Sequence, residues 1–171
     1  MLDLEASFFQ KMKTAYDLIN EFYGNRCAKR SGVPLINHIN EGLKILDLLN
    51  CCDATKQAYA IHPIVQDGES LANNYENMQH LDGKTLIFAM EYRRTANAWL
   101  CGMKKPKNPL SPLHQVNQML VADKIQNRKD FEIYHKGTHE NSAALTQYFA
   151  DWLDTLGVSE TDYIKWLELI K

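Results

Sequence analysis

Apolar residues recur at intervals of three or four along most of this 171-residue chain, which is the spacing of one face of an amphipathic helix. The pattern is clear between Leu2 and Phe22, and Ile39, Leu43 and Leu46 repeat it later in the chain. Few segments alternate apolar and polar residues at every second position, as half-buried strands do. The sequence therefore predicts an all-α fold built as a helical bundle.

Capping and helix-breaking residues suggest where the helices begin and end. Gly24 ends the first helix, Asp53 offers an N-cap, and Ser159 followed by Asp162 marks the start of the last helix. The prolines between 104 and 112 exclude a continuous helix there. The expected helices cover residues 2–22, 53–65, 84–100, 113–130, 138–156 and 159–170, with one more around His38 and one short helix within 66–84. The helix at 84–100 is either continuous or broken near Arg93, and Thr138 or Asn141 caps the helix at 138–156.

The length, net charge and cysteine content of the chain limit the kinds of protein and of binding partner to expect. A chain of this length is most simply one domain, residues 1–171, with a substantial core. Its formal net charge of −2 gives no electrostatic signature of nucleic acid or anionic membrane, so we expect neither DNA nor a membrane as partner. No apolar run approaches the roughly 18 residues that span a bilayer. Four cysteines without paired metal spacing, and no secretory leader, predict reduced thiols and a cytoplasmic location.

Three separate segments place potential metal ligands in or beside apolar runs. The ligands are His38, His62 and Asp123, each on a different predicted helix. Asp123 directly follows the apolar run 119–122, so its carboxylate should be buried, and an unpaired buried charge is costly. A divalent metal is one partner that would balance this charge, and Lys124, Arg128 or a helix terminus are the alternatives.

In this order, the three segments resemble the metal site of HD-domain phosphohydrolases, most of all the guanosine tetraphosphate hydrolase domain of the RelA/SpoT family and its stand-alone metazoan homologues. Residues 30–38 look like the family's Gly-x-Pro-Tyr-x-x-His segment, with Leu35 in place of tyrosine. His62 aligns with the histidine of the His-Asp doublet. Residues 123–127 are similar to the family's Ala-Asp-Lys-Leu-x-Asn signature. The likeness covers nearly the whole chain and implies a single HD-type helical domain.

The resemblance also implies a cofactor, a ligand and roles for individual residues. His38, His62 and Asp123 would hold a divalent metal, with manganese as the expected ion. Lys29 takes the place of an arginine that packs against guanine, and Arg30 and Asn127 join it in the nucleotide site. The implied partner is a guanine nucleotide or another phosphorylated nucleotide.

Two departures from the family pattern bear on catalysis. The aspartate of the doublet is replaced by Pro63, which has no donor atom and also removes the helical hydrogen bond to the Tyr59 carbonyl, so a kink is expected. The family's Glu-Asp pair reads Gln66-Asp67, and a neutral amide cannot accept a proton as a carboxylate does. Asp67 could replace the missing base. We expect weak or absent hydrolysis of guanosine tetraphosphate.

Three functions are therefore open: a metal-dependent nucleotide phosphohydrolase, a non-catalytic module that senses or sequesters a nucleotide, and a protein-interaction scaffold. Trp152, Tyr163 and Trp166 could anchor a protein partner or a second copy of the chain, although aromatic residues at this spacing more often belong to the core. The remaining histidines have no role in the family and are expected at the surface. They are His80, His114, His135 and His139.

Overall fold

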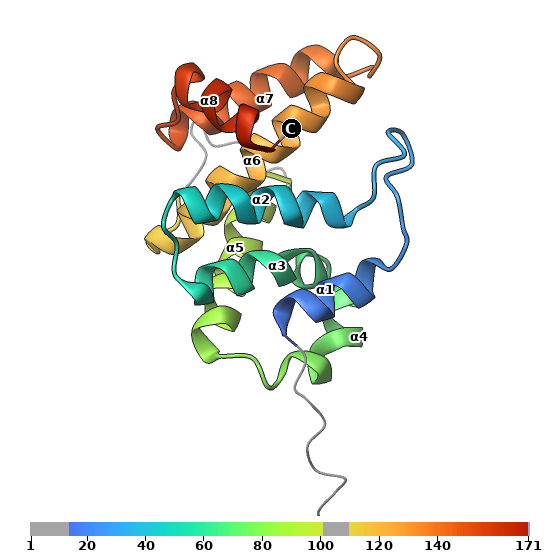
Figure 1. Ribbon diagram of the computed structural model, residues 1–171, viewed down its shortest axis with the longest axis vertical. Coiled ribbons are helices and arrows are strands. Elements are labelled where there is room, and N and C mark those ends of the chain that lie inside the picture. The colour runs from blue at the N-terminus through green and yellow to red at the C-terminus, as the bar shows by residue number, and fades with distance from the viewer. Residues whose placement is uncertain (1–13, 101–109, 171) are drawn as a thin grey trace, which may run out of the picture.

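A computed structural model describes residues 14–100 and 110–170, and in these ranges the chain forms eight helices and no sheet, which confirms the all-α prediction (Figure 1). Cys27 and Pro34 form an isolated antiparallel bridge within the loop that precedes the second helix. The helices are α1 (Ala15–Tyr23), α2 (Ile36–Leu48), α3 (Asp53–Gln66), α4 (Gly68–Met78), α5 (Gly83–Leu100), α6 (His114–Tyr134), α7 (Ser142–Thr155) and α8 (Glu160–Ile170).

Most of the predicted helices are present, with differences at their ends. Thr14 caps α1 through a capping box with Asp17, and the earlier part of the predicted first helix lies outside the described residues. Asp53 is the first residue of α3 and not its cap, since Cys52 occupies that position. The side chain of Ser159 accepts a hydrogen bond from the Asp162 backbone N–H at 3.1 Å, as expected at the start of α8.

The structure also settles two points that the sequence left open, the continuity of α5 and the N-cap of α7. Helix α5 continues through Arg93 without a break. Asn141, not Thr138, stands at the N-cap of α7, although its side chain makes no capping hydrogen bond. Most of the proline-containing connection 104–112 lies outside the described residues.

Helix α3 lies at the centre of the fold and packs against α1, α2, α4, α5 and α6. In Figure 1, α7 and α8 lie at one end of the molecule and α1 and α4 at the other, with α2 and α3 between them. The side chains of Tyr59, Ile61 and Ile64 on α3 are almost wholly buried. One helix thus carries much of the core and one wall of the candidate site.

Gly42 allows α2 to approach α3 closely. A Cβ atom at this position would overlap the ring of Tyr59, whose hydroxyl group donates a hydrogen bond to the backbone carbonyl of His38 over 3.3 Å. The hydrophobic core continues into the C-terminal helices, where Trp152 and Tyr163 are buried and Trp166 packs against them. The core interpretation of these aromatic residues is therefore confirmed. Across the described residues, no helix has the length and apolar character needed to cross a membrane.

Candidate metal centre

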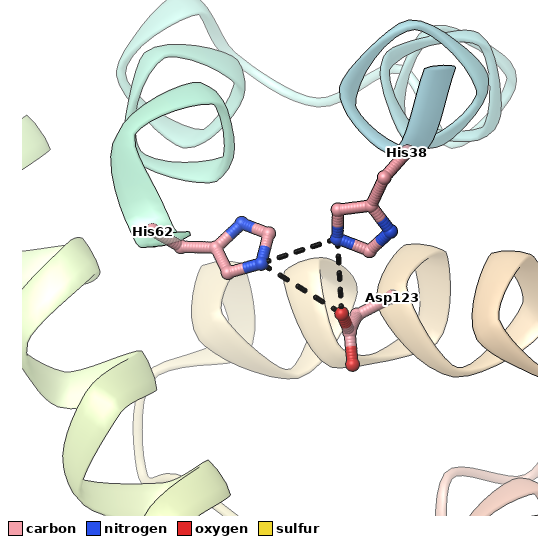
Figure 2. A group of neighbouring side chains, drawn as sticks. All are labelled: His38, His62 and Asp123. Carbon is pink, nitrogen blue, oxygen red and sulfur yellow. Dashed lines mark hydrogen bonds and ion pairs between the residues drawn. The ribbon is translucent and has the colours of Figure 1, made fainter. Parts of the chain in front are cut away.

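Three helices bring His38, His62 and Asp123 together although they are distant in sequence. The Nε2 atom of His38 lies 3.3 Å from Nε2 of His62 and 3.4 Å from Oδ1 of Asp123. Figure 2 shows the side chains pointing toward one another from α2, α3 and α6, with Nε2 of His62 3.8 Å from the same carboxylate oxygen. Within the described ranges, these are the side chains grouped so that they could hold a metal ion, with ligand atoms within 4.8 Å of one another.

The orientation of His62 follows from the proline that comes after it. Pro63 lies inside α3 and has no backbone N–H, so the Tyr59 carbonyl lacks its usual helical donor. The His62 ring takes that place, with 2.6 Å between Nδ1 and the Tyr59 carbonyl oxygen. A carbonyl oxygen only accepts hydrogen bonds, so Nδ1 carries the proton and Nε2 of the neutral ring has an unprotonated lone pair. This lone pair is on the side of His38 and Asp123.

A similar constraint orients His38. Its Nδ1 atom lies 2.5 Å from Oε1 of Gln126, which acts as the acceptor. The amide nitrogen of Gln126 donates to Glu41 at 3.0 Å and to Asp130 at 2.8 Å, so the two carboxylates fix which way the amide faces. Hydrogen bonds of this kind to the outer nitrogen of a histidine set its tautomer and orient it toward a metal.

Asp123 is held by two neighbours on its own helix. Lys124 Nζ lies 2.7 Å from Oδ2, and the Asn127 amide donates to Oδ1 at 2.9 Å. Lys124 is itself buried and lies over the rings of Tyr148 and Trp152, at 5.6 and 5.2 Å from their centroids. Lys124, which we considered as an alternative to a metal ion, is therefore a partner of Asp123. The Oδ1 atom of Asp123 still faces the two histidines.

Burial and neighbouring charges shift the pKa values of His38, His62 and Asp123 in different directions. Burial, with a smaller contribution from His38, lowers the pKa of His62 to about 3. Burial also lowers the pKa of His38, but the hydrogen bond and charge of Asp123 outweigh it and raise that pKa above 6.5. Although burial favours the neutral acid, Lys124 and the histidines hold the pKa of Asp123 well below its usual range. At neutral pH, His62 and Asp123 are in the forms that bind metals.

His38, His62 and Asp123 line a cavity of about 810 Å³. Arg30 and Asn127, which the resemblance places in a nucleotide site, also line it, and so does Gln66, which it places at the catalytic position. Much of the remaining wall is apolar or aromatic, and it includes Tyr23, Leu35, Phe131, Leu145, Tyr148 and Phe149. A cavity with these walls and a few convergent polar groups is typical of small-molecule sites.

Two of the predicted site residues lie elsewhere. Lys29 is exposed and is not part of the cavity wall. Asp67 is also exposed, and it caps α4 by accepting a hydrogen bond from the Ser70 backbone N–H at 2.9 Å, which lowers its pKa. The structure therefore does not bring Asp67 to the position of a catalytic base, nor Lys29 to the position of a residue packed on a nucleotide base.

Sequence reasoning also missed residues that belong to this region. Gln126 was not recognised, because nothing in a sequence marks an amide that will be buried between two carboxylates. His135 and His139 were expected at the surface, yet both are half-buried and line the cavity. Their spacing of four residues was the available signal, and Gly137 between them argued against a shared face. His114 is exposed, as expected, and His80 is half-buried.

Two imidazoles and one carboxylate are a ligand set that occurs in metal centres with open positions for water or substrate. Lys124 balances the charge of Asp123, so a divalent ion would leave the site with an excess of positive charge suited to an anion. Comparison with protein-family models, with curated proteins and with solved structures finds no match to this chain.

Proposed function

We propose that this protein is an HD-type domain that binds a phosphorylated nucleotide and hydrolyses it slowly. His38, His62 and Asp123 would hold a divalent cation, with manganese as the expected ion. The observation that carries the proposal is the convergence of three potential ligand atoms on side chains that separate hydrogen bonds hold in place. The resemblance to HD-domain phosphohydrolases in three spaced segments supports the same conclusion.

The donor set fits a divalent transition metal. Both histidines use Nε2, and the outer nitrogen of each is engaged with an oxygen acceptor. Such an ion lowers the pKa of bound water and attracts phosphate oxygens when it is present. The chain itself would contribute Asn127, which orients the Asp123 carboxylate, and Arg30, which adds a positive charge to the cavity wall.

The cavity has few candidates for a carboxylate base, and this is why we propose slow turnover. Gln66 is neutral, and Asp67 lies outside the cavity wall. Of the carboxylates in that wall, Asp123 is bound by Lys124, and Asp130 is bound by Lys129 and Gln126. The same observation favours the second candidate, a module that binds a nucleotide without hydrolysing it.

Metal titration tests the proposal directly. Purified full-length protein, freed of metal by a chelator, should bind one Mn²⁺ ion in a calorimetric titration. His38→Gln should weaken this binding by at least tenfold, whereas His114→Gln, which removes an exposed histidine, should leave it unchanged. Absence of Mn²⁺ binding in folded protein would refute the metal site.

Nucleotide binding and turnover separate the two candidates. A guanine or adenine nucleotide that binds the native state should raise the melting temperature in the presence of Mn²⁺. Release of phosphate or pyrophosphate that depends on Mn²⁺ and is lost in His38→Gln identifies the hydrolase. A thermal shift without release identifies the binding module, and no shift with any nucleotide refutes both.

A further inference from the structure

The cavity extends well beyond the candidate metal centre, along one face of α6. Asp123, Gln126, Asn127, Asp130, Phe131 and His135 all line it. The first five share one side of α6, with spacings of three or four residues, and His135 directly follows the helix. At about 1.5 Å per residue, the twelve positions from Asp123 to His135 correspond to roughly 18 Å along the helix axis. A ligand that fills this cavity is therefore elongated.

The far part of the cavity is lined by a second group of nitrogen-bearing side chains. Arg30, His135 and His139 belong to its wall, and the same three residues also line a smaller adjacent cavity of about 350 Å³, together with Thr138 and Glu140. Among the described residues, no carboxylate lies within ion-pair distance of Arg30. Glu140 is the acidic side chain in this lining, and it is exposed.

Backbone hydrogen bonds hold the two loops that carry these side chains. Arg30 lies in the loop before α2, where Ala28 N–H donates to the Val33 carbonyl at 2.8 Å and Gly32 N–H to the Ala28 carbonyl at 2.9 Å. After α6, the His139 N–H donates to the His135 carbonyl at 2.9 Å, so the turn at Gly137, with its φ of 83°, brings the two histidines together. These three side chains therefore come from loops that backbone hydrogen bonds hold in place.

The hydrogen bond on His139 determines what its ring can offer. The Asn141 backbone N–H donates to Nδ1 of His139 at 3.0 Å, so Nδ1 is an acceptor and the proton of the neutral ring is on Nε2. His139 thus has a donor available in either protonation state, and Arg30 has several. Donors and positive charge without a bonded carboxylate suit an anionic group such as a phosphate.

We propose that Arg30, His135 and His139 form a second anion-binding site, and that the cavity binds elongated ligands with two anionic groups separated by an apolar or aromatic body. One anionic group lies at the metal centre and the other at Arg30, His135 and His139. The intervening wall contains Leu35, Phe131 and Phe149, which can contact the body of the ligand. This inference rests on the proposed function for the first anionic group and goes beyond it by naming the second.

The test compares two probes that differ only in the second charge. Octyl phosphate has one phosphate group, and octanediol bisphosphate carries a second one on the other end of the same apolar chain. With Mn²⁺ present, the full-length protein should bind the bisphosphate at least tenfold more tightly than octyl phosphate in a calorimetric titration. Equal affinity for the two probes would overturn the proposal.

Substitutions identify which residues cause the preference for the bisphosphate. Arg30→Ala, and separately His135→Gln with His139→Gln, should reduce the preference for the bisphosphate over octyl phosphate to about twofold or less. Lys136→Ala is the matched control, because it removes a positive charge next to His135 that is outside this cavity wall, and it should keep the preference. If the preference survives Arg30→Ala and the double histidine variant, the second site is not where we place it.

The design keeps this inference separate from the metal site. Mn²⁺ titration of the wild type, with no phosphate probe, reports only on His38, His62 and Asp123. If Mn²⁺ does not bind but the bisphosphate is still preferred and Arg30→Ala removes that preference, the second anion site stands while the proposed function fails. If Mn²⁺ binds and the two probes bind equally, the proposed function stands and this inference fails.

Discussion

The carbonyl oxygen of Tyr59 accepts a hydrogen bond from the His62 ring, with 2.6 Å between the oxygen and Nδ1. In an uninterrupted α-helix this oxygen would be bonded to the backbone N–H of residue 63, which is a proline here. The proline at position 63 thus leaves an acceptor free for the histidine before it. The lack of a donor atom at residue 63 and the orientation of the His62 ring therefore have the same cause.

Carboxylates at residues 63 and 66 should strengthen the proposed metal site. Pro63 and Gln66 line the cavity, so Pro63→Asp with Gln66→Glu should place two carboxylates there. We expect at least a tenfold gain in Mn²⁺ affinity, and faster Mn²⁺-dependent release of phosphate from a guanine nucleotide. The single substitutions should each have a smaller effect, because ligand and base act as a unit. A folded double variant with unchanged Mn²⁺ affinity would show that residue 63 does not face the metal.

Metal affinity should depend on pH through His38. Its pKa is raised above 6.5, so the ring is protonated as pH falls through that raised pKa, and a proton competes with the metal. Mn²⁺ affinity should be constant well above the His38 pKa and fall by about tenfold per pH unit below it. His62, with a pKa of about 3, adds nothing to this dependence between pH 5 and 8. Calorimetry in two buffers of different ionisation enthalpy would also detect the proton released, and a flat profile would contradict this.

Gln126 should act on metal binding through the orientation of His38. Gln126→Leu removes the acceptor for Nδ1 of His38 and should weaken Mn²⁺ binding by about 10- to 100-fold, as is usual for residues that orient histidine ligands. Gln118→Leu makes the same chemical change at a half-buried position of α6 that is not in the cavity wall, and it should have no effect on metal affinity. A loss of affinity in both variants would point to a general change in α6 instead.

The contact between α2 and α3 should tolerate no side chain at residue 42. Gly42→Ala places a Cβ atom against the Tyr59 ring, and overpacking of this kind lowers the free energy of unfolding by about 1–3 kcal/mol. Gly83→Ala is the control, because a Cβ atom there meets no neighbouring atom within 4 Å. Urea denaturation of the two variants measures the difference. Equal stability of the two variants would mean that the helices separate without cost.

The sequence was sufficient for the helices because burial of one helical face leaves a periodic pattern. Ile39 and Leu46, for example, are both completely buried, as their spacing predicts. Boundaries were less certain where several residues compete for the cap, as at Cys52 and Asp53. Such competition depends on tertiary contacts that a single sequence does not show.

The candidate site was predictable only in part, because its residues come from three helices and two loops. The resemblance of spaced motifs identified His38, His62 and Asp123, and the structure brings them together. The position of Asp67 could not be inferred, since the same residue type serves as a helix cap or as a base. His139 reaches the cavity through a turn, whose path depends on packing outside the segment itself.

Lys124 gives the core around Asp123 an internal counter-ion, with 2.7 Å between its Nζ and the carboxylate, beneath two aromatic rings. The fold therefore does not depend on a bound cation to neutralise its buried acid, as structural metal domains do. Substitutions at the surrounding ligand positions can alter chemistry without unfolding the chain. This arrangement separates the stability of the fold from the presence of a metal ion.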